Sequence, residues 1–156
     1  MRFTGLVPLF LGVVATPAWA ASQLLDAIAA GRPVIDLRAR YENIGDNSKI
    51  VQTGEAGTLR ARLGYETGAW NGLSVQADFD QLWLLGGDYN STRNGKTTLP
   101  IIADPAMTAL NRLQLTYASG FDTKFVLGRQ RLLIGNQRFI GNSGWRQHEQ
   151  TFDALS

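Results

Sequence analysis

Charged residues recur at every second position in two segments of the chain, 34–42 and 58–66. Most of them are arginines, whose planar guanidinium groups bind carboxylates and phosphates through paired hydrogen bonds. A row of guanidinium groups interspersed with carboxylates has the chemistry of an anion-binding surface. The residues that carry this pattern are Asp36, Arg38, Arg40, Glu42, Arg60, Arg62 and Glu66.

The positions between these charges are apolar, which predicts β-strands with two unlike faces. Successive side chains of a strand point to opposite faces of its sheet, so one face is apolar and the other is charged. Repetition of the pattern predicts an all-β fold: an antiparallel up-and-down meander that forms the N-terminal portion of a transmembrane β-barrel around a charged, water-filled lumen. The apolar positions are Ile35, Leu37, Ala39, Tyr41, Leu59, Ala61, Leu63 and Tyr65.

The sequence predicts six strands, separated alternately by tight turns and long polar loops. The turns at 68–72 and 119–122 contain the residue types that favour tight turns. The loops at 43–57, 86–108 and 135–149 are rich in Gly, Asn and Asp. Short turns at one end and long loops at the other are typical of outer-membrane barrels. The predicted strands span 34–42, 58–67, 73–85, 109–118 and 123–134, and a sixth begins near Gln150.

The charges also predict a register for the hairpin between the second and third strands. A hairpin centred on Trp70 places Arg62 opposite Asp78 and Arg60 opposite Asp80, close enough for ion pairs. A slip by one residue would turn both arginines toward lipid, at a cost of about 2–4 kcal/mol for each arginine near the membrane midplane. We therefore expect the ion pairs to set this register.

The fifth strand has two possible orientations. Phe125 and Leu127 indicate an apolar face at odd-numbered positions, but Arg129 and Arg131 continue the same series. A β-bulge at Gly128 would re-aim the strand and return both arginines to the lumen. In the alternative orientation, the lipid-facing residues are Val126, Leu132 and Ile134.

The N-terminal region has the features of an export signal. Arg2 precedes a short apolar run, and Ala18-Trp19-Ala20 forms a small-residue cleavage site, so we expect a cleaved signal peptide and a location in the cell outer membrane. Ser22 can cap a short helix that leads into the first strand. The predicted organisation is a signal peptide at 1–20, a periplasmic lead-in helix at 21–33 and an incomplete β-barrel at 34–156.

Composition argues against several other function classes. A formal net charge of +2 is too balanced to indicate binding of nucleic acid. The chain has no cysteine and one histidine, His148, which argues against a zinc site, and no cofactor is expected. His148 lies beside Glu149 in a polar loop, but no nucleophile motif accompanies it, so no enzymatic activity is expected.

Several short motifs resemble one family. They include 40–42, 58–67, 94–97, 103–105, 128–131 and 136–139, and the most specific are Trp145-Arg146-Gln147 and Gln150-Thr151-Phe152-Asp153-Ala154. These motifs resemble the alginate-export family of proteobacterial porins over nearly all of the chain that follows residue 20. The resemblance implies a large barrel of about 16–18 strands, with an arginine-rich constriction that includes the positions of Arg112 and Arg131. Chains of that family are more than twice as long, so this chain is expected to be an N-terminal fragment.

The sequence therefore predicts an outer-membrane porin whose partners are membrane lipid and anionic or small polar solutes, and the resemblance extends these solutes to polysaccharide. The alternative is a soluble periplasmic β-sandwich that acts as a binding module, in which the apolar faces pack on each other. The residues expected to line the pore and its constriction are Arg38, Arg40, Arg60, Arg62, Asp78, Asp80, Arg112, Arg129 and Arg131.

Overall fold

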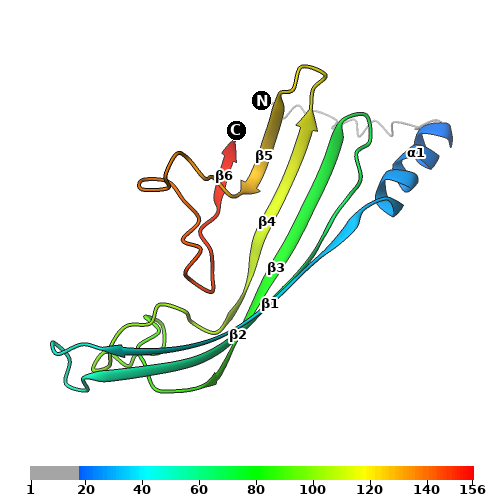
Figure 1. Cartoon of the computed structure of the whole chain (residues 1–156). Coiled ribbons are helices and arrows are strands. Elements are labelled where there is room, and N and C mark those ends of the chain that lie inside the picture. Colours follow the sequence, from blue (N-terminus) through cyan, green and yellow to red (C-terminus); the bar gives the residue numbers. More distant parts are fainter. Residues whose placement is uncertain (1–17) are drawn as a thin grey trace, which may run out of the picture.

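The computed structural model describes residues 18–156, which form six β-strands and one helix. The strands make a single antiparallel sheet in the order of the sequence (Figure 1). This arrangement confirms the predicted all-β, up-and-down meander with a short N-terminal helix. Most of the predicted signal peptide, residues 1–17, lies outside the described residues. The elements are α1 (Ala18–Ala29), β1 (Arg32–Gly45), β2 (Thr53–Glu66), β3 (Leu73–Gly86), β4 (Met107–Ala118), β5 (Lys124–Gln130) and β6 (Phe152–Leu155).

The first predicted loop is much shorter than expected. β1 and β2 pair along their whole lengths, so the loop predicted at 43–57 shrinks to residues 46–52. Polar rungs extend this ladder because backbone N–H and C=O groups pair whatever side chains flank them. Across one such rung the Asn43 amide donates a hydrogen bond of 3.1 Å to the Glu55 carboxylate.

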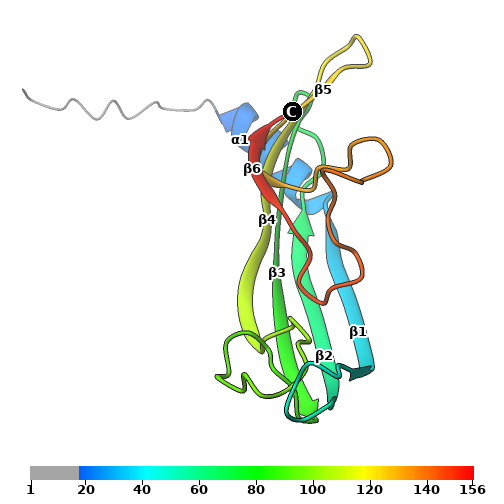
Figure 2. The same ribbon diagram turned by 90° about the vertical axis from the view of Figure 1, so that its left-hand side faces the viewer.

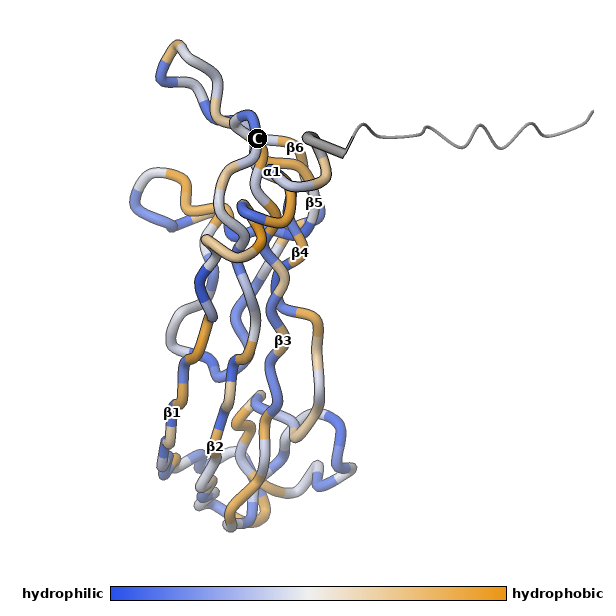
Figure 3. Tube along the Cα trace, turned by 90° about the vertical axis from the view of Figure 1, so that its right-hand side faces the viewer, coloured by the Kyte–Doolittle hydropathy of each residue, from blue (hydrophilic) through white to orange (hydrophobic). Residues whose placement is uncertain are grey.

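The apolar face of the sheet is exposed and its charged face is buried, the reverse of the arrangement in a soluble protein. Leu37 and Leu63 on one face are 69% and 56% exposed, whereas Arg62 and Asp78 on the other are 2% and 0% exposed. Figure 3 shows hydrophobic and hydrophilic residues alternating along β1, β2 and β3. The apolar face carries Ile35, Leu37, Leu63, Phe79, Leu113, Leu115 and Leu127, and the charged face carries Asp36, Arg38, Arg60, Arg62, Asp78, Asp80 and Arg112.

Two connecting segments approach the charged face. The segment between β5 and β6, residues 131–151, runs along one side of the sheet (Figure 2). The loop 87–106 folds at the end of the sheet where β2 begins and β3 ends. There Tyr89 and Ile102 belong to a small buried apolar cluster. The Tyr89 hydroxyl donates to the Asp104 carbonyl at 3.1 Å. These contacts hold the loop so that Asp104 can reach the arginines of β1.

The hairpin between β2 and β3 has a register two residues away from the prediction. Arg62 lies opposite Asp80 rather than Asp78, and Arg60 lies opposite Leu82 rather than Asp80. A shift by two residues keeps every side chain on its predicted face, because strand side chains alternate with a period of two. The predicted register is therefore wrong, although the four charges do share one face and Arg62 still lies 3.9 Å from Asp78.

An Asn-Gly turn closes this hairpin, and one extra residue at 68–69, opposite Ser74, completes the register. Trp70 and Leu73 exchange two backbone hydrogen bonds, of 2.7 and 2.9 Å, around Asn71 and Gly72. Both central residues have positive φ angles, 51° and 81°. This is the type I′ geometry, which matches the twist of the flanking strands and which Asn-Gly favours. Centring the hairpin on Trp70 overlooked this two-residue signal.

A β-bulge in β4 turns two neighbouring side chains toward the charged face. Asp78 pairs with Arg112, but the next residue, Phe79, pairs with Leu110, so Asn111 is an extra residue. Asn111 and Arg112 both donate to Asp78, at 2.7 and 2.8 Å. Bulges re-aim side chains in this way, and this one adds an amide group to the charged face.

The predicted bulge at Gly128 does not interrupt the pairing of β4 with β5. Gly128 has a positive φ of 117°, yet the register continues and Arg129 lies opposite Leu113. Arg129 therefore stands on the apolar face and not on the charged face. It donates two hydrogen bonds of 2.9 Å to Asp153 of β6, which neutralises it there.

The alternative orientation of the fifth strand is also wrong. Two of its three lipid-facing residues, Leu132 and Ile134, lie beyond the end of β5 at Gln130. The exposed apolar residues of β5 are Phe125 and Leu127. Because β5 ends at Gln130, the chain leaves the sheet there and crosses to the charged side without a bulge.

Helix α1 lies near the short-turn end of the sheet. The Tyr65 hydroxyl of β2 donates to the Ile28 carbonyl at 2.5 Å, which ties the end of the helix to the sheet. The helix begins at Ala18, one turn before the predicted cap at Ser22. Among the described residues, no helix is both long and apolar enough to cross a membrane.

Candidate functional site

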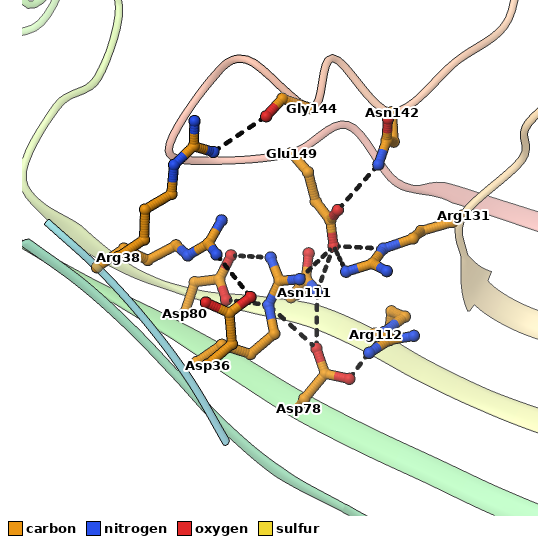
Figure 4. A network of polar contacts seen from close by, with 12 residues as sticks. Asp36, Arg38, Asp78, Asp80, Asn111, Arg112, Arg131, Asn142, Gly144 and Glu149 are labelled. Atoms are coloured by element: carbon orange, nitrogen blue, oxygen red, sulfur yellow. Dashed lines mark hydrogen bonds and ion pairs between the residues drawn. The ribbon is translucent and has the colours of Figure 1, made fainter. Parts of the chain in front are cut away.

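Residues 142–149 cross the charged face and are called the strap here. The backbone carbonyls of the strap accept hydrogen bonds from arginines of β1 and β2. Arg38 donates to the Gly144 carbonyl at 3.0 Å, and Arg60 donates to the Gln147 carbonyl at 3.1 Å. Figure 4 shows the Arg38 side chain reaching from β1 to the strap.

Arg40 binds the strap in a second way. Its guanidinium group lies 4.3 Å from the centre of the Trp145 ring and also donates to the Trp145 carbonyl. A cation–π contact of this kind contributes about 0.5–2 kcal/mol. Arg40 forms ion pairs with Asp104, at 3.4 Å, and with Glu42. Arg38, Arg40 and Arg60, predicted to line an open pore, therefore hold the strap.

Gln147 locks the strap to the sheet and to the loop 87–106. Its side chain is fully buried, and its amide nitrogen donates to the Thr58 hydroxyl at 2.8 Å. Its backbone N–H donates to the Asp104 carboxylate at 3.0 Å. These two donors favour one position of the strap, because leaving a buried donor unpaired is costly, whereas the Oε1 atom of the same side chain is buried without a hydrogen-bond partner.

A second cluster of charges lies at the centre of β2, β3 and β4. Arg62 and Asp80 form a buried two-pronged pair, with nitrogen–oxygen distances of 2.7 and 2.8 Å. Asp78 accepts hydrogen bonds from Arg112 and Asn111. Bidentate arginine–carboxylate pairs combine strength with a defined geometry, so this cluster is a rigid base for whatever binds above it.

Glu149 of the strap binds on top of this cluster (Figure 4). Its Oε1 atom accepts from Arg131 at 2.7 Å and from Asn111 at 2.8 Å, and lies 2.9 Å from a terminal nitrogen of Arg62. Its Oε2 atom accepts from Asn142 at 3.2 Å. Burial by itself would raise the pKa of Glu149, but hydrogen bonds from Arg131 and Asn111 and the charge of Arg62 hold that pKa below its ordinary value.

Acid is expected to release the strap. Because the folded-state pKa of Glu149 is lowered, its contribution to stability is complete above the ordinary glutamate pKa of about 4.3. The contribution is lost as the pH falls through the lower, folded-state pKa. Hydrogen-exchange protection factors of the strap amides should therefore be constant near neutral pH and fall below about pH 4.

The variant E149Q is the control for this pH dependence. Its strap should show low protection that does not change across the same pH window, because glutamine does not titrate. Identical pH profiles for E149Q and the unmodified protein would contradict the role of Glu149.

The network as a whole is electrically balanced. The strap and the loop 87–106 supply the acids that complete this balance, Glu149 and Asp104. Without these two acids, the charged face would carry an excess of arginines. The members of the network are Arg38, Arg40, Arg60, Arg62, Arg112 and Arg131, together with Asp36, Glu42, Asp78, Asp80, Asp104 and Glu149.

The structure brings eight of the nine predicted pore residues into this network and leaves out Arg129. Arg131 joins from the segment after β5 rather than from a strand, through Glu149. The residues that sequence reasoning missed lie in loops or at the bulge: Asp104, Asn111, Trp145, Gln147 and Glu149. Trp145 and Gln147 fall in a motif that the sequence analysis singled out, but nothing in that motif indicated which side chains it would contact.

Comparisons with protein-family models, with curated proteins and with solved structures find no match to this chain. The resemblance to the alginate-export family therefore stays a prediction, and the function rests on the geometry of the charged face and the strap.

Proposed function

We propose that this chain forms part of the wall of a β-barrel channel in the cell outer membrane, and that the channel passes anionic or small polar solutes. The reversed exposure of the sheet carries the proposal. Apolar surface left in water forgoes about 25 cal/mol per Å², and contact with lipid removes that penalty. A barrel wall needs these two faces, one against lipid and one toward a polar lumen.

Closure of such a barrel requires strands beside β1 and β6. Within the described residues, each of these two strands pairs with a neighbour on one side only. Open sheet edges do not occur in hydrocarbon, and the smallest membrane barrels have about eight strands. In this proposal the six strands described are therefore one continuous part of a larger wall.

Arg112 is one of the arginines placed to meet a solute in the lumen. Its side chain retains 15% of its exposure, and it lines an open pocket of about 430 Å³ together with Arg32 and Gln76. Its Nε donates to Asp78, which orients the guanidinium group. A guanidinium held in this way suits carboxylate or phosphate groups, so the proposal includes a preference for anions.

The membrane part of the proposal can be tested with spin labels in the full-length protein. Residues 1–156 contain no cysteine, so a cysteine placed at Leu59, Leu63 or Asp36 is the only labelling site among them. In liposomes, labels at Leu59 and Leu63 should respond to dissolved oxygen, which concentrates in lipid, more than to an aqueous nickel complex. The matched label at Asp36, on the charged face, should respond in the opposite way.

Aqueous quenching at both leucines would contradict the membrane wall. Low accessibility of both labels to oxygen and to the nickel complex would contradict it as well and would favour the soluble periplasmic β-sandwich, in which the apolar faces pack on each other. The channel part is tested by the reversal potential of the full-length protein in a planar bilayer with a KCl gradient. We expect a preference for chloride that is smaller in R112Q. A preference for potassium, or no conductance at all, would contradict it.

A further inference from the structure

We propose that Glu149 is an internal ligand of a carboxylate-binding cage, and that a solute carboxylate opens the strap by taking its place. The cage consists of Arg62, Asn111 and Arg131. This inference rests on the proposed channel function, because it assigns the solute class and the control of access to the same lumen.

The geometry around Glu149 is that of a bound ligand. Its Oε1 atom meets nitrogens of Arg62, Asn111 and Arg131 at 2.6–2.9 Å. These donors come from β2, from the bulge in β4 and from the segment that follows β5. Only one oxygen of the carboxylate is bound by the cage, since Oε2 accepts from Asn142 within the strap itself. A carboxylate from solution could therefore be bound in the same way.

The cage requires one carboxylate besides those of the sheet. Asp80 is bound in two-pronged fashion by Arg62, and Asp78 is bound by Arg112 and Asn111. These bonds leave one terminal nitrogen of Arg62, the second N–H of Asn111 and the whole fork of Arg131 to meet Glu149. Removal of the Glu149 carboxylate from the cage leaves an uncompensated positive charge in a confined site, which favours binding of another anion.

Glu149 is also the only acidic residue of the strap. The other contacts of the strap use backbone carbonyls, the Trp145 ring and the Gln147 amide. Glu149 is the one charged acceptor among these groups, so a solute carboxylate replaces a group of its own kind only there, whereas at Arg38 and Arg60 it would have to displace neutral carbonyls. Release of Glu149 would detach the strap from β4 and from Arg131 while its attachment to β1 and β2 persists, which gives a hinged opening.

The test uses the full-length protein in liposomes with two spin labels, one on the strap at Ser143 and one in the exposed loop at Gln52. Glucuronate is the carboxylate probe, and glucose is the neutral control of similar size. We expect glucuronate, but not glucose, to shift the distance distribution between the labels toward an open population. We expect E149Q to raise the ratio of open to closed strap about tenfold or more without any solute.

Two further variants complete the design. R131Q removes the arginine whose acidic partner is Glu149, so it should open the strap and abolish the response to glucuronate. D88N removes the same charge from the exposed loop pair with Lys96 and should behave like the unmodified protein. Folded protein is verified for each variant by heat-modifiable mobility in detergent gels.

Different results would overturn the internal-ligand inference and the channel proposal. A channel that conducts glucuronate with no change in label distance overturns the internal-ligand inference and leaves the channel function standing. A closed distribution in E149Q, or an equal response to glucose, overturns it as well. A protein that conducts no anions overturns the channel function, and the inference with it.

Discussion

Replacing Arg62 with alanine is expected to lower the free energy of unfolding by about 3–5 kcal/mol, the range for breaking a buried ion pair by removal of one partner. The Arg62 and Asp80 side chains are 3% and 2% exposed, so the carboxylate left behind cannot be solvated by water. Glu149 would lose its contact with Arg62 at the same time. The measurement is urea unfolding of the full-length protein in liposomes, followed by tryptophan fluorescence.

Two matched variants make this result specific. R32A removes an arginine from an exposed pair with Glu66, in which the Arg32 side chain is 76% exposed, and should cost about 0–1 kcal/mol. R62K keeps the charge but loses the planar fork and should fall between R62A and the unmodified protein. Equal losses for R62A and R32A would show that water reaches the Arg62–Asp80 pair, contrary to the burial described above.

Replacing Leu63 with arginine is expected to cost about 2–4 kcal/mol if the apolar face contacts lipid near the membrane midplane. Leu63 is exposed and lies between Ile35 and Phe79 on the neighbouring strands. In water, an arginine at such an exposed position would change the stability by no more than about 0.5 kcal/mol. The same urea titration in liposomes therefore measures which solvent surrounds this face.

The variant I50R is the control for this substitution. Ile50 is 86% exposed but belongs to the loop 46–52, outside the strands, so arginine there should be nearly neutral in either environment. A neutral L63R would contradict the membrane wall. A large loss in both variants would show that the effect does not depend on the apolar face, and would contradict it as well.

The alternation of residue types was enough to predict the two faces of the sheet. Side-chain direction in a strand depends only on whether a position is odd or even, so the prediction for Arg38 and Leu37 survived every error in register. For the same reason, a two-residue error in the β2–β3 hairpin changed the partner of Arg62 without moving it to the other face. Fold class and the facing of β1 to β3 were local properties of the sequence, whereas the facing of Asn111 and Arg129 was not.

The exact partners were not predictable from charge alone. Ion pairing allowed Arg62 to lie opposite Asp78 or Asp80, and the Asn71-Gly72 turn together with one extra residue at 68–69 placed it opposite Asp80. The bulge that exposes Asn111 to Asp78 also depends on how two whole strands pair. A bulge signal at Gly128 was predicted from one strand and failed for that reason.

The sequence by itself determined that β1 to β3 have an apolar and a charged face, because residue types alternate along these strands with a period of two. Only the tertiary structure decided what covers the charged face. The strap reaches Arg38 and Arg60 across sequence separations of 106 and 87 residues, and its bonds come largely from backbone carbonyls, which every residue possesses. Contacts to backbone carbonyls therefore cannot be predicted from residue types. The position of Glu149 among three donors was equally unpredictable, because it depends on where β5 ends and on the bulge in β4.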